Sequence, residues 1–136
     1  MQNTVAAFFR EQHPRGVQAA ILFGSHARGT SHADSDIDVG LLLDRRLLAT
    51  RAERAAIAER VMLDLIAATH CNDVDVVVLN DALAELAVAV LDTGALMRCA
   101  DQEALHAFTR DAHLRFADLQ PFLDRTRRLK LDAILR

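Results

Sequence analysis

The sequence predicts an α/β (α+β) fold, a small mixed β-sheet flanked by helices, and three observations support this prediction. Short apolar runs that end abruptly at glycine or polar residues indicate strands. Longer segments rich in alanine and leucine carry charges on one side and indicate helices, and the two kinds of segment are interleaved. The 136 residues, 51% hydrophobic and 26% charged, suit one globular domain. We therefore expect a single domain over 1–136, with a core at about 17–100 and a helical C-terminal region at about 101–136.

The first third of the chain is expected to hold one helix, two strands and the loop between them. An apolar cluster at 5–9 indicates a helix, which a His-Pro turn at 13–14 closes. Val17–Phe23 is predicted to be a buried strand because this apolar run stops at a glycine. The polar, glycine-rich and serine-rich segment 24–35 is expected to be a loop with at most one helical turn. The second strand is expected over 36–43.

The middle of the chain continues the alternation. A helix rich in alanine and leucine is expected over 47–69, and a third strand over 74–79. Asn80 and Asp81 are residues that often cap helices, so we expect them to begin a helix over 82–91. Gly94 is then a natural stop for this helix.

The C-terminal region combines a short edge strand, Ala95–Cys99, with a long helical segment capped by Asp101. Pro121 is expected to break or kink that segment. Its second half carries an apolar stripe interleaved with basic residues. The stripe consists of Phe116, Leu119, Phe122, Leu123, Leu131, Ile134 and Leu135, and the basic residues are Arg125, Arg127, Arg128 and Lys130. This segment is either one more helix packed on the core or a helix that docks a partner protein or a second copy.

The composition excludes several classes of protein. A net charge of −3 argues against a protein that neutralises a nucleic-acid backbone. Six phenylalanines without tryptophan or tyrosine do not build a base-stacking platform, so no direct nucleic-acid binding is expected. The sequence lacks a signal peptide and any apolar run near the ~20 residues of a membrane span, so we expect a cytoplasmic protein. Cys71 and Cys99 have no metal-ligand spacing and are expected to be reduced, partly buried thiols.

A glycine-serine pair and two carboxylates at alternating positions are the residues that indicate a site for a metal ion and a phosphate group. Gly24-Ser25 is followed by ten residues and then by Asp36-Ile37-Asp38. Side chains alternate along a strand, so Asp36 and Asp38 are expected on one face and Ile37 in the core. Two carboxylates on one face repel each other unless a cation such as Mg²⁺ lies between them. The glycine lets backbone approach a phosphate closely, and the serine offers a hydroxyl and an N–H.

A third carboxylate is expected from another strand, because two metal ions need more ligands than one such pair supplies. The third predicted strand begins Asp73-Val74-Asp75-Val76, which places Asp73 and Asp75 on a common face. Either of them can converge on the first two acids. The apolar β-branched run after Asp75 favours Asp75, with Asp73 at the entrance of the strand.

These residues resemble the nucleotidyltransferase superfamily with the DNA polymerase β-like fold. GSHARGTSHADSDID is similar to its GSx10DxD signature and to the minimal nucleotidyltransferase (MNT) branch, and VDVVVLN is similar to the strand with the third acid. The resemblance covers roughly residues 17–80. It implies two Mg²⁺ ions and ATP as the nucleotide donor. The residues to which it assigns roles are Asp36 and Asp38 as metal ligands, Asp75 as third acid, metal ligand and general base, and Gly24, Ser25 and Arg28 as nucleotide-binding residues.

The resemblance extends to MNT antitoxins encoded beside HEPN-domain toxins, and it implies transfer of AMP from ATP to a tyrosine hydroxyl of such a toxin. The chain has no tyrosine, so a tyrosine acceptor must lie on another chain. Two alternatives stay open: an antitoxin that masks its partner by binding alone, and an aminoglycoside-type enzyme acting on a small molecule. The latter generally has an extra substrate-binding domain. The chain itself lacks the Arg-x4–6-His motif of HEPN ribonucleases.

Overall fold

The structure, a computed structural model, describes residues 1–28 and 36–135, so most of the loop expected at 24–35 lies outside the described residues. The described part is a mixed α+β fold with one four-stranded sheet, which confirms the predicted fold class. The elements are α1 (Gln2–Gln12), β1 (Val17–Phe23), α2 (Ser25–Arg28), β2 (Ile37–Leu43), α3 (Arg51–Thr69), β3 (Val74–Val78), the 3-10 turn η1 (Leu79–Asp81), α4 (Ala84–Thr93), β4 (Ala95–Cys99) and α5 (Gln102–Leu135).

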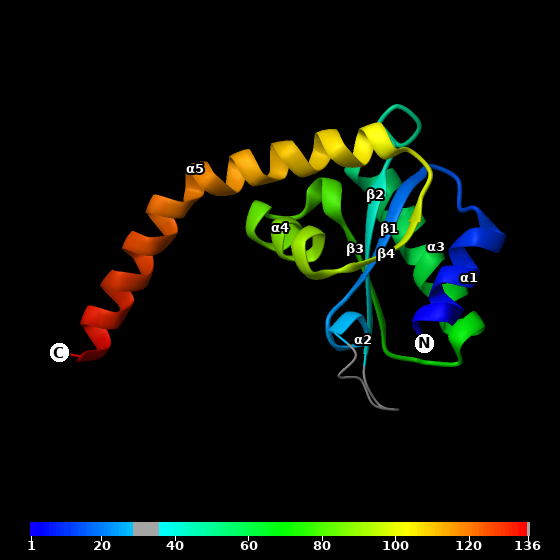
Figure 1. Ribbon diagram of the computed structural model, residues 1–136, viewed down its shortest axis with the longest axis horizontal. Helices are drawn as coiled ribbons and strands as arrows, with labels where there is room; N and C mark the ends of the chain where they lie inside the picture. The colour runs from blue at the N-terminus through cyan, green and yellow to red at the C-terminus, as the bar shows by residue number, and fades with distance from the viewer. Residues whose placement is uncertain (29–35, 136) are drawn as a thin grey trace.

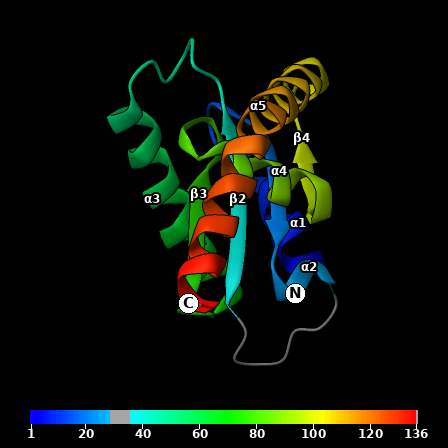
Figure 2. The ribbon, with the colours of Figure 1, turned by 90° about the vertical axis from the view of Figure 1, so that its left-hand side faces the viewer.

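The sheet has the strand order β3-β2-β1-β4, and helices cover both of its faces (Figure 1). β1 pairs antiparallel with β2 and with β4, whereas β2 pairs parallel with β3. α1 and α3 pack on one face, and α4 and the first half of α5 pack on the other (Figure 2). Because β2 and β3 run parallel, both of them begin at the same end of the sheet.

The core follows the alternation of the strands. Ile37 and Val39 of β2 are 0% exposed and pack with Phe9 of α1 and Leu65 of α3. Ile21 of β1 faces the other way and packs against the α4 and α5 side. A one-residue shift in strand register would move every one of these side chains to the wrong face, so burial on both faces fixes the register of the sheet.

The strands expected at Val17–Phe23 and Ala95–Cys99 are confirmed to the residue, but the start of α3 was predicted four residues too early. The helix begins at Arg51 because Thr50 caps it. The Thr50 hydroxyl accepts a hydrogen bond from the Glu53 backbone N–H at 3.1 Å and donates one to the Glu53 carboxylate at 3.0 Å. This reciprocal pair satisfies a free backbone donor of the first turn.

The prediction that Asn80 and Asp81 cap α4 was wrong. Both residues lie in η1, and α4 begins three residues later, after Leu83, without a side-chain cap. The Asn80 amide bonds both backbone groups of Leu43, accepting at 2.9 Å and donating at 2.9 Å. Asp81 instead pairs with Arg54 of α3. Each side chain therefore joins η1 to another element, and a purely local interpretation of these residues missed both contacts.

Arg54 and Asp81 form a paired contact beneath η1. Arg54 Nε and Nη2 donate to the two carboxylate oxygens at 2.9 and 2.8 Å, and Nη1 donates to the Leu48 carbonyl at 3.0 Å. The two side chains are 7% and 15% exposed. The hydrogen bonds from Arg54 hold the pKa of Asp81 below its usual value of 3.8. A lowered carboxyl pKa stabilises the fold at pH values above the pKa of the unfolded chain.

We expect Asp81→Ala to lower the melting temperature by about 5 °C at pH 7, because it leaves Arg54 buried without its anionic partner. The difference from the wild type should shrink as the pH falls through the lowered native pKa of Asp81, where the wild-type carboxylate is protonated as well. Circular dichroism melts at pH 7 and at pH 3 measure both effects. Arg46→Ala is the control, because Arg46 is 83% exposed in its ion pair with Asp44. Equal melting temperatures for Asp81→Ala and the wild type would contradict the stabilising role.

α5 is continuous through Pro121, so the proline does not break the helix. The helix changes direction in its orange part, the region that contains Pro121, and its second half projects away from the rest of the domain (Figure 1). The expected kink is therefore confirmed, and the expected cap as well, since the Asp101 carboxylate accepts a hydrogen bond from the Ala104 backbone N–H at 3.0 Å. None of the described helices is long and apolar enough to span a membrane.

Candidate active site

The two predicted carboxylate strands lie side by side in the sheet. In the parallel pairing of β2 with β3, Asp38 is the register partner of Asp75. Register partners project to the same face of a sheet, so the two carboxylates share one face. Asp36 immediately precedes β2 and is exposed. A hollow of about 290 Å³ at this end of the sheet is lined by Asp36, Asp38, Asn72, Asp73, Val74 and Asp75.

The electrostatics of Asp38 reflect this crowding. Partial burial raises the pKa of the Asp38 carboxyl above its usual value, and the charges of Asp75 and Asp36 raise it further. His26 acts in the opposite direction and lowers the pKa of the same carboxyl. Repulsion between carboxylates costs free energy that a bound cation would remove. The site is therefore suited to hold positive charge.

Asp73, the alternative third acid, has a different position. It precedes β3, and its backbone carbonyl accepts a hydrogen bond from the Ile37 N–H at 2.8 Å, which begins the parallel pairing of the two strands. The residue lines the hollow, but its carboxylate is not among the groups that perturb the pKa of Asp38. The register thus favours Asp75 as the acid that acts together with Asp38.

Gly24 brings the end of β1 against the same carboxylate. Its φ of +75° lies in the left-handed region that favours glycine, and a Cβ added here would meet Asp38 Oδ2 at 2.6 Å. Ser25 then opens the short helix α2. Arg28 ends α2, and the contacts of its side chain lie outside the described residues. Gly24 therefore lies against Asp38 and Ser25 follows it in the chain, whereas the nucleotide-binding roles of Gly24, Ser25 and Arg28 stay predictions.

His26 is the neighbour of the site that the sequence analysis did not single out. It is 6% exposed, and its backbone carbonyl accepts a hydrogen bond from the Gln2 side chain at 2.8 Å. This bond ties the start of α1 to the turn after β1. The sequence offered no signal beyond the position of His26 in the motif, because this contact joins residues 24 positions apart.

The acidic cluster fits Mg²⁺ only together with further ligands. In the described part of the chain, no group of three or more His, Cys, Asp or Glu side chains is arranged to hold a metal ion by itself. Mg²⁺ in nucleotide-processing enzymes usually takes one or two carboxylates and completes its shell with water and substrate phosphates. Asp38 and Asp36, next to Asp75, supply such a partial set. The residues present therefore fit an ion that binds together with a nucleotide.

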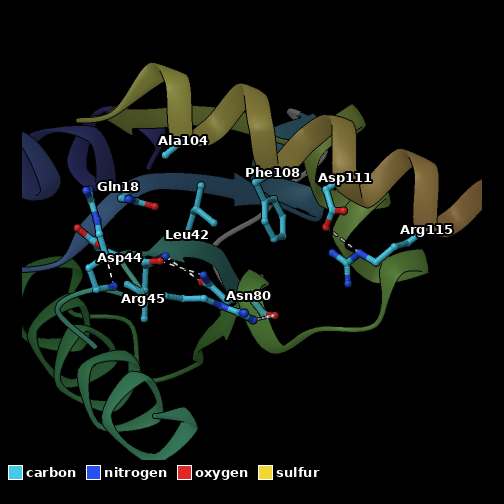
Figure 3. Close-up of a pocket in the computed structure, with 11 residues that line it drawn as sticks. Gln18, Leu42, Asp44, Arg45, Asn80, Ala104, Phe108, Asp111 and Arg115 are labelled. Atoms are coloured by element: carbon cyan, nitrogen blue, oxygen red, sulfur yellow. Dashed lines mark hydrogen bonds and ion pairs between the residues drawn. The ribbon is translucent and has the colours of Figure 1, made fainter. Parts of the chain in front are cut away.

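A second cavity, of about 450 Å³, lies at the opposite end of β2, between α5 and the segment after that strand (Figure 3). Phe108 and Leu42 line its apolar part, and Arg45 and Arg115 lie at its edge (Figure 3). Arg115 is paired with Asp111 at 3.0 Å. None of the predicted site residues borders this cavity, so it is separate from the acidic hollow.

A glycine turn at the end of β1 lies beside carboxylates from the two neighbouring strands β2 and β3, a set of groups suited to a phosphate bound with a divalent cation. A comparison with protein-family models gives the class: the family described as "Polymerase beta, Nucleotidyltransferase" matches residues 3–103. The chain therefore belongs to the polymerase beta nucleotidyltransferase family. No curated protein matches the sequence.

Solved structures with the same fold come from toxin–antitoxin complexes. A chain of a toxin–antitoxin crystallised with AMP-PNP is 24% identical, with a TM-score of 0.66 over 99% of this chain and 98% of that chain. A chain of a mutant MntA–HpeT toxin–antitoxin is 23% identical, with a TM-score of 0.67 over 100% of this chain and 99% of that chain. A chain from a Shewanella oneidensis complex of a tri-AMPylated HEPN toxin with MNT antitoxin is 21% identical, with a TM-score of 0.63 over 100% of both chains. At these identities the likeness shows a shared fold.

Proposed function

We propose that this protein is an Mg²⁺-dependent adenylyltransferase that transfers AMP from ATP to a hydroxyl, a tyrosine, of a partner HEPN-domain toxin and thereby acts as its antitoxin. The observation that carries the proposal is the register pairing of Asp38 with Asp75 beside the Gly24 turn. The neighbours support the choice of nucleotide and partner, because one was crystallised with AMP-PNP and another with an AMPylated HEPN toxin.

In the proposed reaction, the acceptor hydroxyl oxygen bonds to the α-phosphorus of ATP as the bond to pyrophosphate breaks. Asp75 accepts the hydroxyl proton. The close backbone approach at Gly24 and the N–H and hydroxyl of Ser25 hold the triphosphate, together with Arg28. Asp36, Asp38 and Asp75 would hold Mg²⁺, which neutralises phosphate charge when bound. These residues position the reactants and supply the electrostatic stabilisation on which such transfers depend.

The acceptor must come from another molecule if it is a tyrosine, because the chain contains none. The described strands form one four-stranded sheet, and α5 extends from it (Figure 1). A protein acceptor is supported by the neighbours, one of which is an MNT antitoxin in complex with a tri-AMPylated HEPN toxin.

The proposal predicts that a HEPN-domain protein is encoded in the adjacent reading frame and that it gains mass in AMP-sized steps when it is incubated with this protein, ATP and Mg²⁺. Intact-mass spectrometry measures the gain. Excess EDTA is expected to abolish it, because Mg²⁺ is required to neutralise the triphosphate. A Tyr→Phe substitution at the modified position of the acceptor should remove the same mass step. Stable binding of the partner without a mass change would contradict transfer and favour inhibition by masking.

A further inference from the structure

α5 is attached to α4 by apolar packing and by two ion pairs, one near each end of α4. Ala112 of α5 is 0% exposed and packs on α4. His113 pairs with Asp92, near the end of α4, at 2.9 Å. Arg127 pairs with Glu85, near the start of α4, at 2.9 Å. The two pairs differ in one respect, because histidine loses its charge near neutral pH and arginine does not.

Both ring nitrogens of His113 face acceptor oxygens. Nδ1 lies 2.8 Å from the Thr109 carbonyl oxygen, and Nε2 lies 2.9 Å from Asp92 Oδ1. A carbonyl oxygen can only accept, so Nδ1 donates. A carboxyl group loses its proton about 2.5 pH units below an imidazolium, so Asp92 also accepts and Nε2 donates. Only the doubly protonated, charged ring makes both hydrogen bonds at once.

Asp92 is the charged group that faces this ring from the elements packed on α5. α4 has one other charged residue, Glu85, which lies at its far end in the pair with Arg127. β1, which also packs on α5, has no charged residue. The other charged residues near His113 belong to α5 itself, and none of them is among the groups that perturb its pKa. They are Arg110, Asp111, Arg115 and Asp118, within five positions, and Asp124, Arg125 and Arg128, which line the hollow that His113 also borders.

The surroundings of His113 favour its charged form. The hydrogen bond to the Thr109 carbonyl raises the pKa of His113 above its ordinary value of 6.5, partial burial lowers it by a smaller amount, and the Asp92 carboxylate raises it further. The folded protein therefore holds this proton more tightly than the unfolded chain does. The stabilisation is complete below pH 6.5 and is lost as the pH rises through the raised pKa.

We propose that His113 is a pH-dependent latch that holds α5 on the end of α4 while its ring is doubly protonated and loosens this contact when the ring loses one proton to solvent. The neutral ring keeps one N–H and therefore one of the two hydrogen bonds. Arginine and glutamate side chains both carry charge between pH 6 and pH 9, so the Arg127–Glu85 pair persists. α5 is thus bound more tightly in mild acid than in mild alkali, and this inference does not depend on the proposed function.

The test compares Asp92→Asn, His113→Gln and the double variant with the wild type, each as the full chain. Circular dichroism melts at pH 6 and at pH 9 measure the coupling between the two positions. Asp92→Asn is expected to lower the melting temperature by about 2 °C at pH 6 and by less than about 1 °C at pH 9. In the His113→Gln background the same substitution should have little effect at either pH. Other titrating groups are common to all four proteins and cancel in these differences.

Glu85→Gln is the matched control, because it removes the other ion pair between the same two helices. Its effect on the melting temperature should be equal at pH 6 and pH 9. Nitrogen-15 NMR of the histidine rings gives a direct readout: both nitrogens of His113 are expected to carry a proton at pH 6, and the titration midpoint should fall in Asp92→Asn. A singly protonated ring at pH 6, an unchanged midpoint, or a coupling of equal size at both pH values would overturn the latch.

Discussion

Asp38→Asn is expected to reduce nucleotidyl transfer by about 10³-fold or more, because it removes a charge on which both metal binding and phosphate neutralisation depend. Asn keeps the size of the side chain, so the fold should persist. Asp75→Asn is expected to have an effect of the same order through loss of the proton acceptor. Initial rates of AMP incorporation into the acceptor, with radiolabelled ATP, measure both losses.

The matched control is Asp73→Asn. This acid lines the same hollow but is not the register partner of Asp38, so its substitution should leave the rate within a few-fold of the wild type. The reverse ranking, with Asp73→Asn inactive and Asp75→Asn active, would show that the general base is Asp73. Full activity of folded Asp38→Asn would refute the site itself.

The stability of Asp38→Asn gives an independent readout. Burial and the neighbouring carboxylates raise the pKa of Asp38, so the native state binds a proton at this position more tightly than the unfolded chain does. The ionised Asp38 therefore destabilises the fold at pH values above its raised native pKa. At pH 7 the neutral variant is expected to melt at a higher temperature than the wild type, and the difference should disappear in acid. If Asp38→Asn gains stability and loses transfer activity, the carboxylate of Asp38 serves the reaction at a cost to the stability of the fold.

The parts of the fold that local patterns determine were the parts the sequence predicted well. The apolar run of β1 ends at a glycine, and alternation places Ile37 in the core and Asp38 on the other face; both features were correct to the residue. The shared face expected for Asp73 and Asp75 stays a prediction, because Asp73 precedes β3 (Val74–Val78). What local patterns lacked was the partner strand, since only the parallel register of β2 with β3 distinguishes the two acids.

Contacts between distant elements account for what the sequence analysis missed. Asp81 is of a residue type that often caps helices, but its carboxylate accepts hydrogen bonds from Arg54, which lies 27 residues earlier in α3. His26 is buried, and its backbone carbonyl accepts a hydrogen bond from the side chain of Gln2, 24 residues earlier. The kink in α5 was expected from Pro121, but the apolar stripe alone did not show at which residue the helix leaves the core. Secondary-structure propensity describes one segment at a time, whereas each of these features depends on how two segments pack together.

Gly24→Ala is expected to reduce transfer by about 10²-fold, and the reason lies in a single contact. The new Cβ would meet Asp38 Oδ2 at 2.6 Å, so the carboxylate must move, and a displacement of about 1 Å in a catalytic group costs a rate factor of that order. The φ of +75° adds backbone strain, which lowers stability by about 1 kcal/mol. A loss of activity alone would not separate the two effects.

Gly16→Ala separates strain from displacement. Gly16 has a similar φ of +83°, but its Cβ would meet the flexible end of the Leu48 side chain at 2.8 Å, far in sequence from the carboxylates. Both variants should therefore lose melting temperature by similar amounts, and only Gly24→Ala should lose transfer activity at a temperature where both are folded. If Gly16→Ala lost activity equally, backbone strain would explain the effect. If Gly24→Ala kept full activity, the close approach of the glycine turn to Asp38 would have no part in positioning that carboxylate.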